Sequence, residues 1–389
     1  NINNQGEELI VYNVYDELGQ LKEKKVGGSD VANAVNTLQD ISYNYNIRGW
    51  LTDINDVDAP SPDQLFAFNI RYNNPENSNT VALYNGNIAE THWRTQNTLN
   101  INSDAKRSYS YEYDALNRLN NANYLTPHQM FGALANEQED FFEGHISYDR
   151  NGNILKLTRK GVTSSNTIDV IDDLDYDYLA HSNQLSAVGD IADEQGFKDG
   201  TNNGYDYSYD LNGNMIKDEN KDILSIEYNH LNLPTMVEFE VPNKTMQKYI
   251  KYTYDATGVK LAKEVREDIS ATTSSSPSFT YYAGAFIYGQ NSFTSPVNLK
   301  FISQPEGYIE PVNSSDLSLG FDYVYQFKDH LGNIILSYKD NNGNLEIVEE
   351  NNYYPYGLEH KGYNNVVNGT HYPFGYNGKE ENDELGLEW

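Results

Sequence analysis

Four carboxylates crowd together near the end of the chain. Glu380, Glu381, Asp383 and Glu384 follow directly on Lys379. Crowded carboxylates acquire separate pKa values, so that one can act as an acid and another as a base, as in aspartic proteases. The Lys379 ammonium would hold a neighbouring carboxylate in its ionised form. The alternative interpretation is a solvated turn that carries several carboxylates and no chemistry.

A second group of oxygen-bearing side chains has the spacing of a calcium loop. In the stretch DLNGNMIKDENKD, Asp210, Asn212 and Asn214 occupy alternate positions, as the first ligands of an EF-hand do. An EF-hand then needs Gly at its sixth place and Glu at its twelfth, where this chain has Met215 and Lys221. Asp and Asn are also the residues that begin tight turns. Turn chemistry therefore explains this group better than a metal site does.

The other common signatures of catalysis are missing from the sequence. The His residues include no pair with the helical spacing of a zinc protease, and His330 is expected to be a surface residue of a turn. There is no Gly-rich phosphate loop and no Gly-x-Ser-x-Gly motif. The absence of Cys excludes thiol catalysis, disulfides and Cys-bound zinc. The sequence therefore predicts neither a metal site nor a bound cofactor.

The elements that must position these residues come from a short phrase that the chain repeats. The stretches ISYDRNGNIL, YSYDLNGNMI and YTYDATGVKL each place Tyr before Asp, with Gly three residues after the Asp. We call the Asp or Asn of each copy its anchor. The anchors are Asp16, Asn46, Asp114, Asp149, Asp210, Asn229, Asp255, Asp329 and Asp340. Gly or Asn stands three residues after every anchor, and an apolar residue stands five after it except at Pro234 and Lys260.

This spacing predicts a β-hairpin in each copy. Asp or Asn begins a type I turn well, because its side chain accepts backbone N–H bonds, and Gly or Asn tolerates the positive φ that follows. The aromatic residues before the turn alternate, as Tyr109, Tyr111 and Tyr113 do, which places them on one face of a strand. Such hairpins in series pair into one long antiparallel sheet. Because the copies are unevenly spaced, and the interval from Asp149 to Asp210 could hide degenerate copies, we expect a continuously wound sheet rather than a strict solenoid.

Three stretches depart from the repeat. Thr126–Gly144 has apolar spacing that suits a short helix. Asp268–Phe279 is rich in Ser and Thr and is expected to be a loop. Gln304–Asp316 carries Pro and Gly and is expected to be irregular.

The composition narrows the class of protein. The chain has 389 residues, 33 of them Tyr, and a formal net charge of -30. Tyr favours strands, and the negative charge argues against nucleic acid as a partner, because phosphate binding needs clustered Lys and Arg. No apolar run is long enough to span a membrane, so we expect no membrane insertion. Because the chain starts at Asn1 without Met, we expect it to be a piece of a longer protein.

The repeated phrases and the C-terminal motifs resemble those of a known family. The Tyr-Asp phrases resemble the YD repeats of Rhs proteins, and YNYNIRGWLTDIND resembles a phrase common in Rhs proteins of the Bacteroidetes group. The ordered stretches KDHLGNI, YYPYGLEHKGYN and YNGKEENDELGLEW look like the Rhs-associated core. The resemblance covers nearly the whole chain. It divides the chain into a YD-repeat shell at 1–265, a continuation of the shell at 266–320 and the core region, truncated at its C-terminal end, at 321–389.

The resemblance implies an all-β fold, in which YD-repeat hairpins form a long antiparallel sheet wound into a hollow shell that the core plugs. In this family the shell encloses a C-terminal polypeptide, commonly a toxin, and many members cut themselves after the core by means of aspartates. Asp383 lies where the first such Asp-x-x-Gly motif falls, which makes it the candidate catalytic residue. The second aspartate is absent because the sequence stops at Trp389, so the protease dyad is incomplete here.

We therefore expect a shell-forming scaffold of a secreted or cell-surface bacterial protein, which encapsulates and later releases its own C-terminal effector. The effector would be its main partner, together with secretion or cell-surface components. Self-cleavage at the core would be the only enzymatic activity. Two alternatives stay open: a cell-surface adhesin or glycan-binding protein, and an enzyme acting on polysaccharides, which would need two carboxylates in a cleft.

Overall fold

The structure is a computed structural model, and it describes residues 6–59, 61, 63–96, 106–125, 140–192, 195–200, 204–241, 248–267, 276–361, 372–382 and 384–387. The candidate catalytic Asp383 lies outside these residues, as does most of the helix predicted for Thr126–Gly144. The end of that stretch already belongs to a strand, which begins at Glu143. No α-helix occurs in the described ranges, and none of their segments is a helix with the length and hydropathy of a membrane span.

The strands form two antiparallel sheets in which each strand pairs with its neighbours in the sequence. The first sheet has 12 strands: β1 (Val11–Tyr15), β2 (Leu21–Val26), β3 (Gln39–Tyr45), β4 (Leu51–Ile54), β5 (Phe66–Arg71), β6 (Glu90–Thr95), β7 (Arg107–Tyr113), β8 (Leu119–Leu125), β9 (Glu143–Tyr148), β10 (Ile154–Val162), β11 (Ile168–Tyr178) and β12 (Leu185–Asp190). The second sheet has 13 strands: β13 (Tyr207–Tyr209), β14 (Met215–Asp218), β15 (Ile223–Tyr228), β16 (Pro234–Phe239), β17 (Lys248–Tyr254), β18 (Lys260–Arg266), β19 (Ser278–Ala283), β20 (Phe286–Gln290), β21 (Asn298–Gln304), β22 (Gly307–Pro311), β23 (Phe321–Lys328), β24 (Ile334–Asn341) and β25 (Asn344–Glu350). Three short 3-10 turns complete the regular structure: η1 (Leu317–Leu319), η2 (Tyr376–Gly378) and η3 (Glu384–Gly386).

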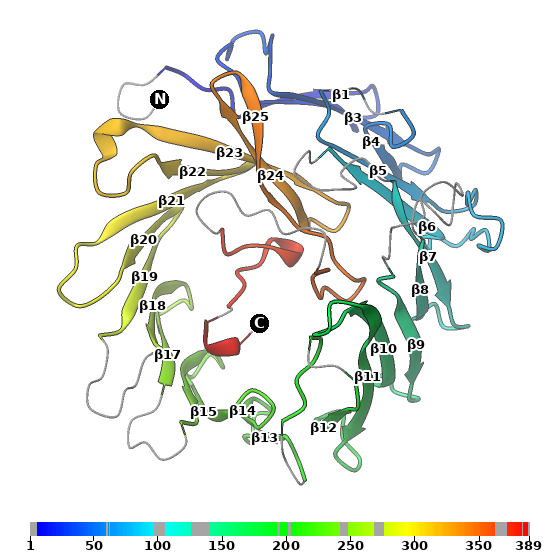
Figure 1. Ribbon diagram of the computed structural model, residues 1–389, viewed down its shortest axis with the longest axis vertical. Coiled ribbons are helices and arrows are strands. Elements are labelled where there is room, and N and C mark those ends of the chain that lie inside the picture. The colour runs from blue at the N-terminus through cyan, green and yellow to red at the C-terminus, as the bar shows by residue number, and fades with distance from the viewer. Residues whose placement is uncertain are drawn as a thin grey trace.

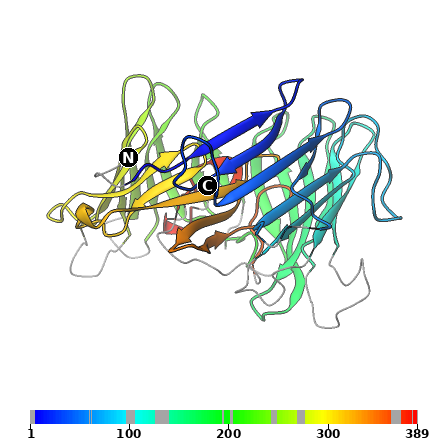
Figure 2. The same ribbon diagram turned by 90° about the horizontal axis from the view of Figure 1, so that it is seen from above.

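Together the two sheets curve round a ring, which we call the wall (Figure 1). At one junction the sheets are bridged by Asp206, whose backbone N–H donates to Ser186 O at 2.8 Å and whose carboxylate accepts from Val188 N at 2.7 Å. At the other junction the last strands return to the first, and Figure 2 shows the two ends of the wall side by side. There Lys24 Nζ lies 2.8 Å from a Glu306 carboxylate oxygen, and the rings of Phe66 and Phe327 stand 5.6 Å apart. The predicted curved antiparallel wall of hairpins is therefore confirmed, but it consists of two sheets rather than one continuous sheet.

The hairpin turns have the predicted chemistry. The anchor side chain accepts from the backbone N–H groups two and four residues further on, as Asp210 does from Asn212 and Asn214 at 2.8 and 2.9 Å. The same pair of bonds recurs at Asp16, Asn46, Asp114, Asp149, Asn229, Asp255 and Asp329. The residue three places after each of these anchors has a positive φ. Asp340 is wrong as an anchor, because it lies within β24, and the turn there is built from Asn342 and Gly343.

Six tyrosine hydroxyls each bond back to the hairpin of a preceding anchor. The hydroxyl donates to the carbonyl of the residue five places after the preceding anchor. The pairs are Tyr72 with Leu51, Tyr148 with Leu119, Tyr178 with Ile154, Tyr228 with Met215, Tyr254 with Pro234 and Tyr353 with Ile334. Pro234 breaks the apolar pattern yet keeps this role, because only its carbonyl is needed and proline retains that group. We call this series the tyrosine ladder.

Asparagine side chains link neighbouring turns in a second series. Asn212 and Asn214, on either side of Gly213, both donate to Asn232 Oδ1 of the next turn, at 3.4 and 3.0 Å. Asn85 and Asn87 donate in the same way to Asn117, and Asn151 and Asn153 to Asn183. Asn117 and Asn232, which stand at the positive-φ position, therefore do more than replace Gly. We call these contacts the asparagine ladder.

The structure corrects two expectations about the departures from the repeat. Gln304–Asp316 is not irregular throughout, because Gly307–Pro311 forms β22 between β21 and β23. Residues 268–275 of the predicted loop lie outside the described part, and Ser278 and Phe279 already belong to β19. The interval between Asp149 and Asp210 does hold a further hairpin, formed by β11 and β12.

Candidate functional site

Residues 351–361, 372–382 and 384–387, which we call the C-terminal segment, lie inside the ring (Figure 1). They contain two isolated β-bridges and the 3-10 turns η2 and η3 rather than strands. Side chains far away in the sequence hold this segment against the wall in three places. These three places define the candidate site, because they surround the predicted carboxylate cluster and the motifs of the proposed core.

The first contact joins the segment to β7 and to Phe141, two residues before β9. His360 is 1% exposed and its ring stacks on that of Phe141 at 4.2 Å. Tyr109 donates its hydroxyl proton to Phe141 O at 2.7 Å, and His360 Nε2 lies 2.8 Å from the same hydroxyl. Because Tyr109 has only one proton to donate, His360 donates through Nε2–H. Burial, together with nearby Arg107, lowers the pKa of His360 well below its usual value, so the ring is neutral.

A buried ion triad lies beside this contact. Arg159 of β10 pairs with Glu143 at 2.5 Å and with Asp172 at 2.9 Å, and both carboxylates are fully buried. The second oxygen of Glu143 accepts from the backbone N–H of Tyr356 at 2.9 Å. Burial raises the pKa of Glu143 although Arg159 opposes the shift. The triad therefore holds the wall and the C-terminal segment together through one carboxylate.

The second contact is aromatic and lies on β21 and β22. The ring of Tyr372 stacks on that of Tyr308 at 4.3 Å and meets that of Phe301 edge-on at 5.0 Å. Phe374 packs on the same cluster. Paired aromatic rings of this kind contribute stability beyond the area that they bury.

The third contact holds two of the four carboxylates that the sequence singled out. Glu380 pairs with Lys260 at 3.0 Å and with Lys263 at 3.2 Å, and it accepts from the Tyr282 hydroxyl at 2.6 Å. Burial opposes ionisation of Glu380, but Lys263, Tyr282 and Lys260 outweigh it and lower the pKa of this carboxyl. Lys263 also pairs with Glu384 and is itself only 3% exposed. Ammonium groups of β18 thus hold these carboxylates. The sequence had suggested Lys379 for this role instead.

Asp383 is flanked by two residues that contact the same ammonium group. Lys263 Nζ donates to Asn382 Oδ1 at 3.4 Å and pairs with Glu384. Beyond them Leu387 is fully buried in a cluster with Ile226 and Val237 of the wall. The chain on both sides of Asp383 is therefore fixed to the inside of the wall, while Asp383 itself lies outside the described residues.

Glu359 of the C-terminal segment is a further carboxyl with an altered pKa. Burial raises the pKa of Glu359 to about 7, and the charges of Glu381 and Glu349 add to this rise. A carboxyl that titrates near neutral pH changes its charge within the physiological range. Glu359 was not among the candidates from the sequence, and nothing in its local pattern marks it.

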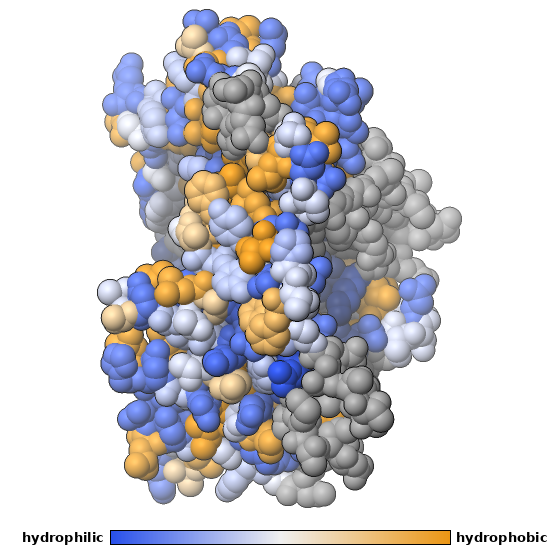
Figure 3. Space-filling view, turned by 90° about the vertical axis from the view of Figure 1, so that its left-hand side faces the viewer, coloured by the Kyte–Doolittle hydropathy of each residue, from blue (hydrophilic) through white to orange (hydrophobic). Residues whose placement is uncertain are grey.

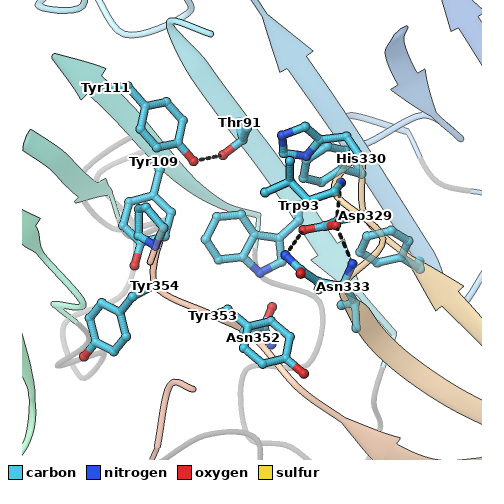
Figure 4. Close-up of a pocket in the computed structure, with 15 residues that line it drawn as sticks. Thr91, Trp93, Tyr109, Tyr111, Asp329, His330, Asn333, Asn352, Tyr353 and Tyr354 are labelled. Atoms are coloured by element: carbon cyan, nitrogen blue, oxygen red, sulfur yellow. Dashed lines mark hydrogen bonds between the residues drawn. The ribbon is translucent and has the colours of Figure 1, made fainter. Parts of the chain in front are cut away.

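A pocket lies between the wall and the C-terminal segment, and Figure 4 shows its lining. Aromatic side chains dominate that lining: Phe66, Phe68, Trp93, Tyr109, Tyr111, Tyr353 and Tyr354. His330, expected at the surface, does lie in its turn but is partly buried, and its ring stacks on that of Phe68 at 5.4 Å. Burial lowers the pKa of His330, which keeps its ring neutral.

One wall residue of the site that was not among the candidates does stand out in the sequence. Lys260 interrupts the apolar position of the repeat, and its ammonium group binds Glu380. Lys263, Arg159 and His360 gave no such signal, because their partners lie more than a hundred residues away or in another strand. Among the described residues, no group of three or more His, Asp or Glu is arranged to hold a metal ion. Asp210, Asn212 and Asn214 make turn and ladder bonds instead.

Comparison with known proteins identifies solved structures of similar fold. No family model matches the chain, and no curated protein matches it in sequence. Solved structures do match. The crystal structure of TcdB2-TccC3 has a TM-score of 0.55 at 13% identity, over 97% of this chain and 19% of that one. The same complex without the hypervariable C-terminal region has a TM-score of 0.53 at 14% identity, over 97% of this chain and 18% of that one.

A third match is the Photorhabdus luminescens Tc holotoxin pore carrying a mutation in TccC3, with a TM-score of 0.54 at 13% identity. It covers 96% of this chain and 18% of that one. The chain thus spans about a fifth of the length of the proteins that it matches. At this identity the likeness concerns the fold alone, and the curved antiparallel wall described here is the fold that this chain shares with those Tc toxin chains.

Proposed function

We propose that this chain is the shell-forming part of a secreted or cell-surface bacterial Rhs/YD-repeat protein of the Bacteroidetes type. The shell encloses a C-terminal effector polypeptide and releases it later. The effector is the main partner, and components of secretion or of the cell surface handle the whole particle. The shared fold with Tc toxin chains supports a toxin-related scaffold.

The observation that carries this proposal is the position of the C-terminal segment. The segment lies within the ring and is fixed to its inner side through Glu380, Glu384 and Leu387 (Figure 1). A polypeptide that continues from this point starts on the inside of the wall. Enclosure of such a polypeptide then needs no separate recognition event, because the covalent connection already places it there.

We further propose that Asp383 takes part in self-cleavage after the core. Lys263 fixes Asn382 and Glu384 on either side of it, and a fixed backbone favours a reaction that depends on position. An acid and base pair also needs a second carboxylate, which the resemblance to Rhs proteins assigns to an aspartate that follows the motif around Asp383.

Enclosure is tested by limited proteolysis of the natural full-length protein. We expect the polypeptide beyond Leu387 to resist added protease as long as the wall is folded, and to be digested once the wall is unfolded with urea. Equal rates of digestion in the folded and unfolded protein would contradict enclosure. A glycan array on the same protein would reveal the alternative role, through a tight and specific ligand.

Self-cleavage is tested separately with Asp383→Asn in the same full-length protein. We expect one uncut band on a gel where the wild type gives two. Asp340→Asn, near the end of β24 and outside the C-terminal segment, is the matched control and is expected to be cut normally. Normal cutting of the Asp383 variant would remove this residue from the mechanism without affecting the enclosing role.

A further inference from the structure

A lysine, an asparagine and a carboxylate meet at the third contact. Lys263 Nζ donates to Asn382 Oδ1 at 3.4 Å and pairs with Glu384. These groups lie on the inner side of β18, whereas the outer side of this part of the wall carries interspersed polar and apolar side chains (Figure 3). An amine, a carboxamide and an acid–base group are the three components that the formation of a new amide bond between side chains requires.

The surroundings of Lys263 favour its neutral form as a reactant. The lysine is only 3% exposed, and Val265, two residues further along β18, is buried together with Leu387. Burial disfavours charged groups, so the transfer of a proton from the ammonium group to a carboxylate, which leaves two neutral groups, is easier here than in water. A neutral lysine amine is a nucleophile.

Of the two carboxylates that contact Lys263, Glu384 is the one that is available for proton transfer. Glu380 is also held by Lys260 and by the Tyr282 hydroxyl. Glu384 places one oxygen on Lys263 Nζ, and its other oxygen, Oε2, is buried without a hydrogen-bond partner among the described residues. Protonation of Glu384 by Lys263 therefore breaks no other hydrogen bond, and it needs no access from solvent.

We propose that Lys263 and Asn382 form an isopeptide bond that joins β18 covalently to the C-terminal segment. Glu384 takes a proton from the ammonium group, and the electron pair of Nζ attacks Cγ of Asn382. The Nζ–Cγ bond forms, and the Cγ–Nδ2 bond breaks as Glu384 passes its proton to Nδ2. Glu384 then carries a second proton from Nζ to the departing ammonia, so that one ammonium ion is released and the carboxylate is restored.

The geometry suits this reaction. Cγ of Asn382 is one C=O bond, about 1.2 Å, from the oxygen that Nζ contacts, and groups held about 3–3.5 Å apart react far faster than separate ones. The ion pairs of Lys263 described above are those of the groups before the reaction. The new bond lies one residue before Asp383, so it keeps the C-terminal segment on the wall whether or not the chain is cut beyond it. The inference thus goes beyond the proposed function.

The test is the mass of the purified chain that carries both residues, followed by the masses of its tryptic peptides. Loss of ammonia lowers the mass by about 17 Da. Trypsin does not cut after an acylated lysine, so residues 261–266 should stay attached through Lys263 to the peptide that begins at Glu380. We expect the wild type to give this branched peptide in place of the linear ones.

Variants separate the reaction from folding. Lys263→Arg keeps the positive charge without the nucleophilic amine, and it should give neither the mass loss nor the branched peptide. Glu384→Gln removes the proton acceptor and should slow the formation of the bond about 100-fold after refolding from urea. Lys339→Arg, at a lysine that pairs with Glu310 and Asp322 instead, is the matched control and should form the bond as the wild type does.

Three results would overturn the proposal. One is a chain with the unaltered mass of its sequence, cut completely by trypsin after Lys263. Another is a loss of about 17 Da without the branched peptide, because Asn377, which is followed by Gly378, loses the same mass when it closes to a cyclic imide. The third is a branched peptide that persists in Lys263→Arg. None of these results depends on enclosure of an effector or on cleavage at Asp383.

Discussion

The wall and the C-terminal segment are held in their conformations by opposite means. In the wall eight hairpins are fixed locally by their anchors, and small contacts link neighbouring hairpins, such as Tyr209 with Leu185 and Asn214 with Asn232. The C-terminal segment has two 3-10 turns and two isolated bridges, and it depends on distant side chains such as Lys263 and Tyr308. Many weak, repeated contacts therefore stabilise the wall, whereas a few strong ones stabilise the segment.

The largest effect is expected at the third contact of the segment. Lys263→Met leaves Glu380 and Glu384 partly buried without their shared ammonium group, and breaking a buried ion pair costs about 3–5 kcal/mol. The loss should appear as a lower urea midpoint and as faster hydrogen exchange around 380–387. Lys156→Met, which breaks an exposed pair with Asp175, is the control and should leave both unchanged. A similar result for the two variants would contradict the idea of a few strong contacts.

The second effect depends on pH. The pKa of Glu359 rises from 4.5 to about 7 on folding, so the folded chain binds this proton more tightly than the unfolded chain does. The resulting stabilisation is complete below about pH 4.5 and is lost as the pH rises through about 7, by up to about 3 kcal/mol. Glu359→Gln, which mimics the protonated form, should therefore be more stable than the wild type at pH 8 and equal to it at pH 4.

Urea unfolding at a series of pH values measures this difference. Glu17→Gln, on an exposed turn of the wall, is the control and should follow the wild-type profile. If the stability difference between Glu359→Gln and the wild type is the same at pH 4 and at pH 8, the Glu359 carboxyl does not titrate as described.

The third effect is small for each residue and should add up along the wall. Tyr178→Phe and Tyr254→Phe each remove one hydroxyl of the tyrosine ladder, bonded to Ile154 O and Pro234 O, at about 0.5–1.5 kcal/mol each. The double variant should lose the sum, because the two residues lie in different sheets and share no partner. Tyr205→Phe, at a residue 69% exposed, is the control. A loss of stability at only one of the two positions would contradict the idea that the tyrosine hydrogen bond is a repeated stabilising contact.

The smallest effect is expected in the asparagine ladder. Asn232→Gly removes the acceptor of Asn212 and Asn214 but relieves a φ of 57°. The two consequences oppose each other, so the free energy of unfolding should change by less than about 0.5 kcal/mol. Asn232→Ala loses the bonds and keeps the strain, and it should be about 1 kcal/mol less stable than the Gly variant. Equal stability of the two variants would show that the positive φ is not the governing feature.

Much of the wall was predictable, and the reasons are local. The anchor, the positive φ at Gly213 or Asn117 and the alternating tyrosines follow from interactions within a few residues. The ninth anchor, Asp340, failed because a neighbouring Asn-Gly pair makes a tighter turn one residue later. The strand Gly307–Pro311 was missed because its short length and its Gly and Pro suggest a loop, whereas pairing on both sides makes it a strand.

The site was predictable only in part. The cluster of Glu380, Glu381, Asp383 and Glu384 was visible as a group, and the structure holds Glu380 and Glu384 against one ammonium group. The identity of that group, Lys263, was not visible, because a pairing across more than a hundred residues leaves no local trace. The pocket around Trp93 and His330 was hidden for the same reason, since its two sides come from opposite ends of the chain.

By itself the sequence determined an all-β chain of hairpins, because turn chemistry and the two-residue period of a strand act over a few bonds. Only the tertiary structure decided which face became the inside, where the two sheets join at Asp206 and which wall residues fix the C-terminal segment. Those outcomes depend on the burial of charges and rings that meet only when the sheet has curved round on itself. The repeated sequence can therefore specify each hairpin, whereas the position of the C-terminal segment depends on the complete curved wall.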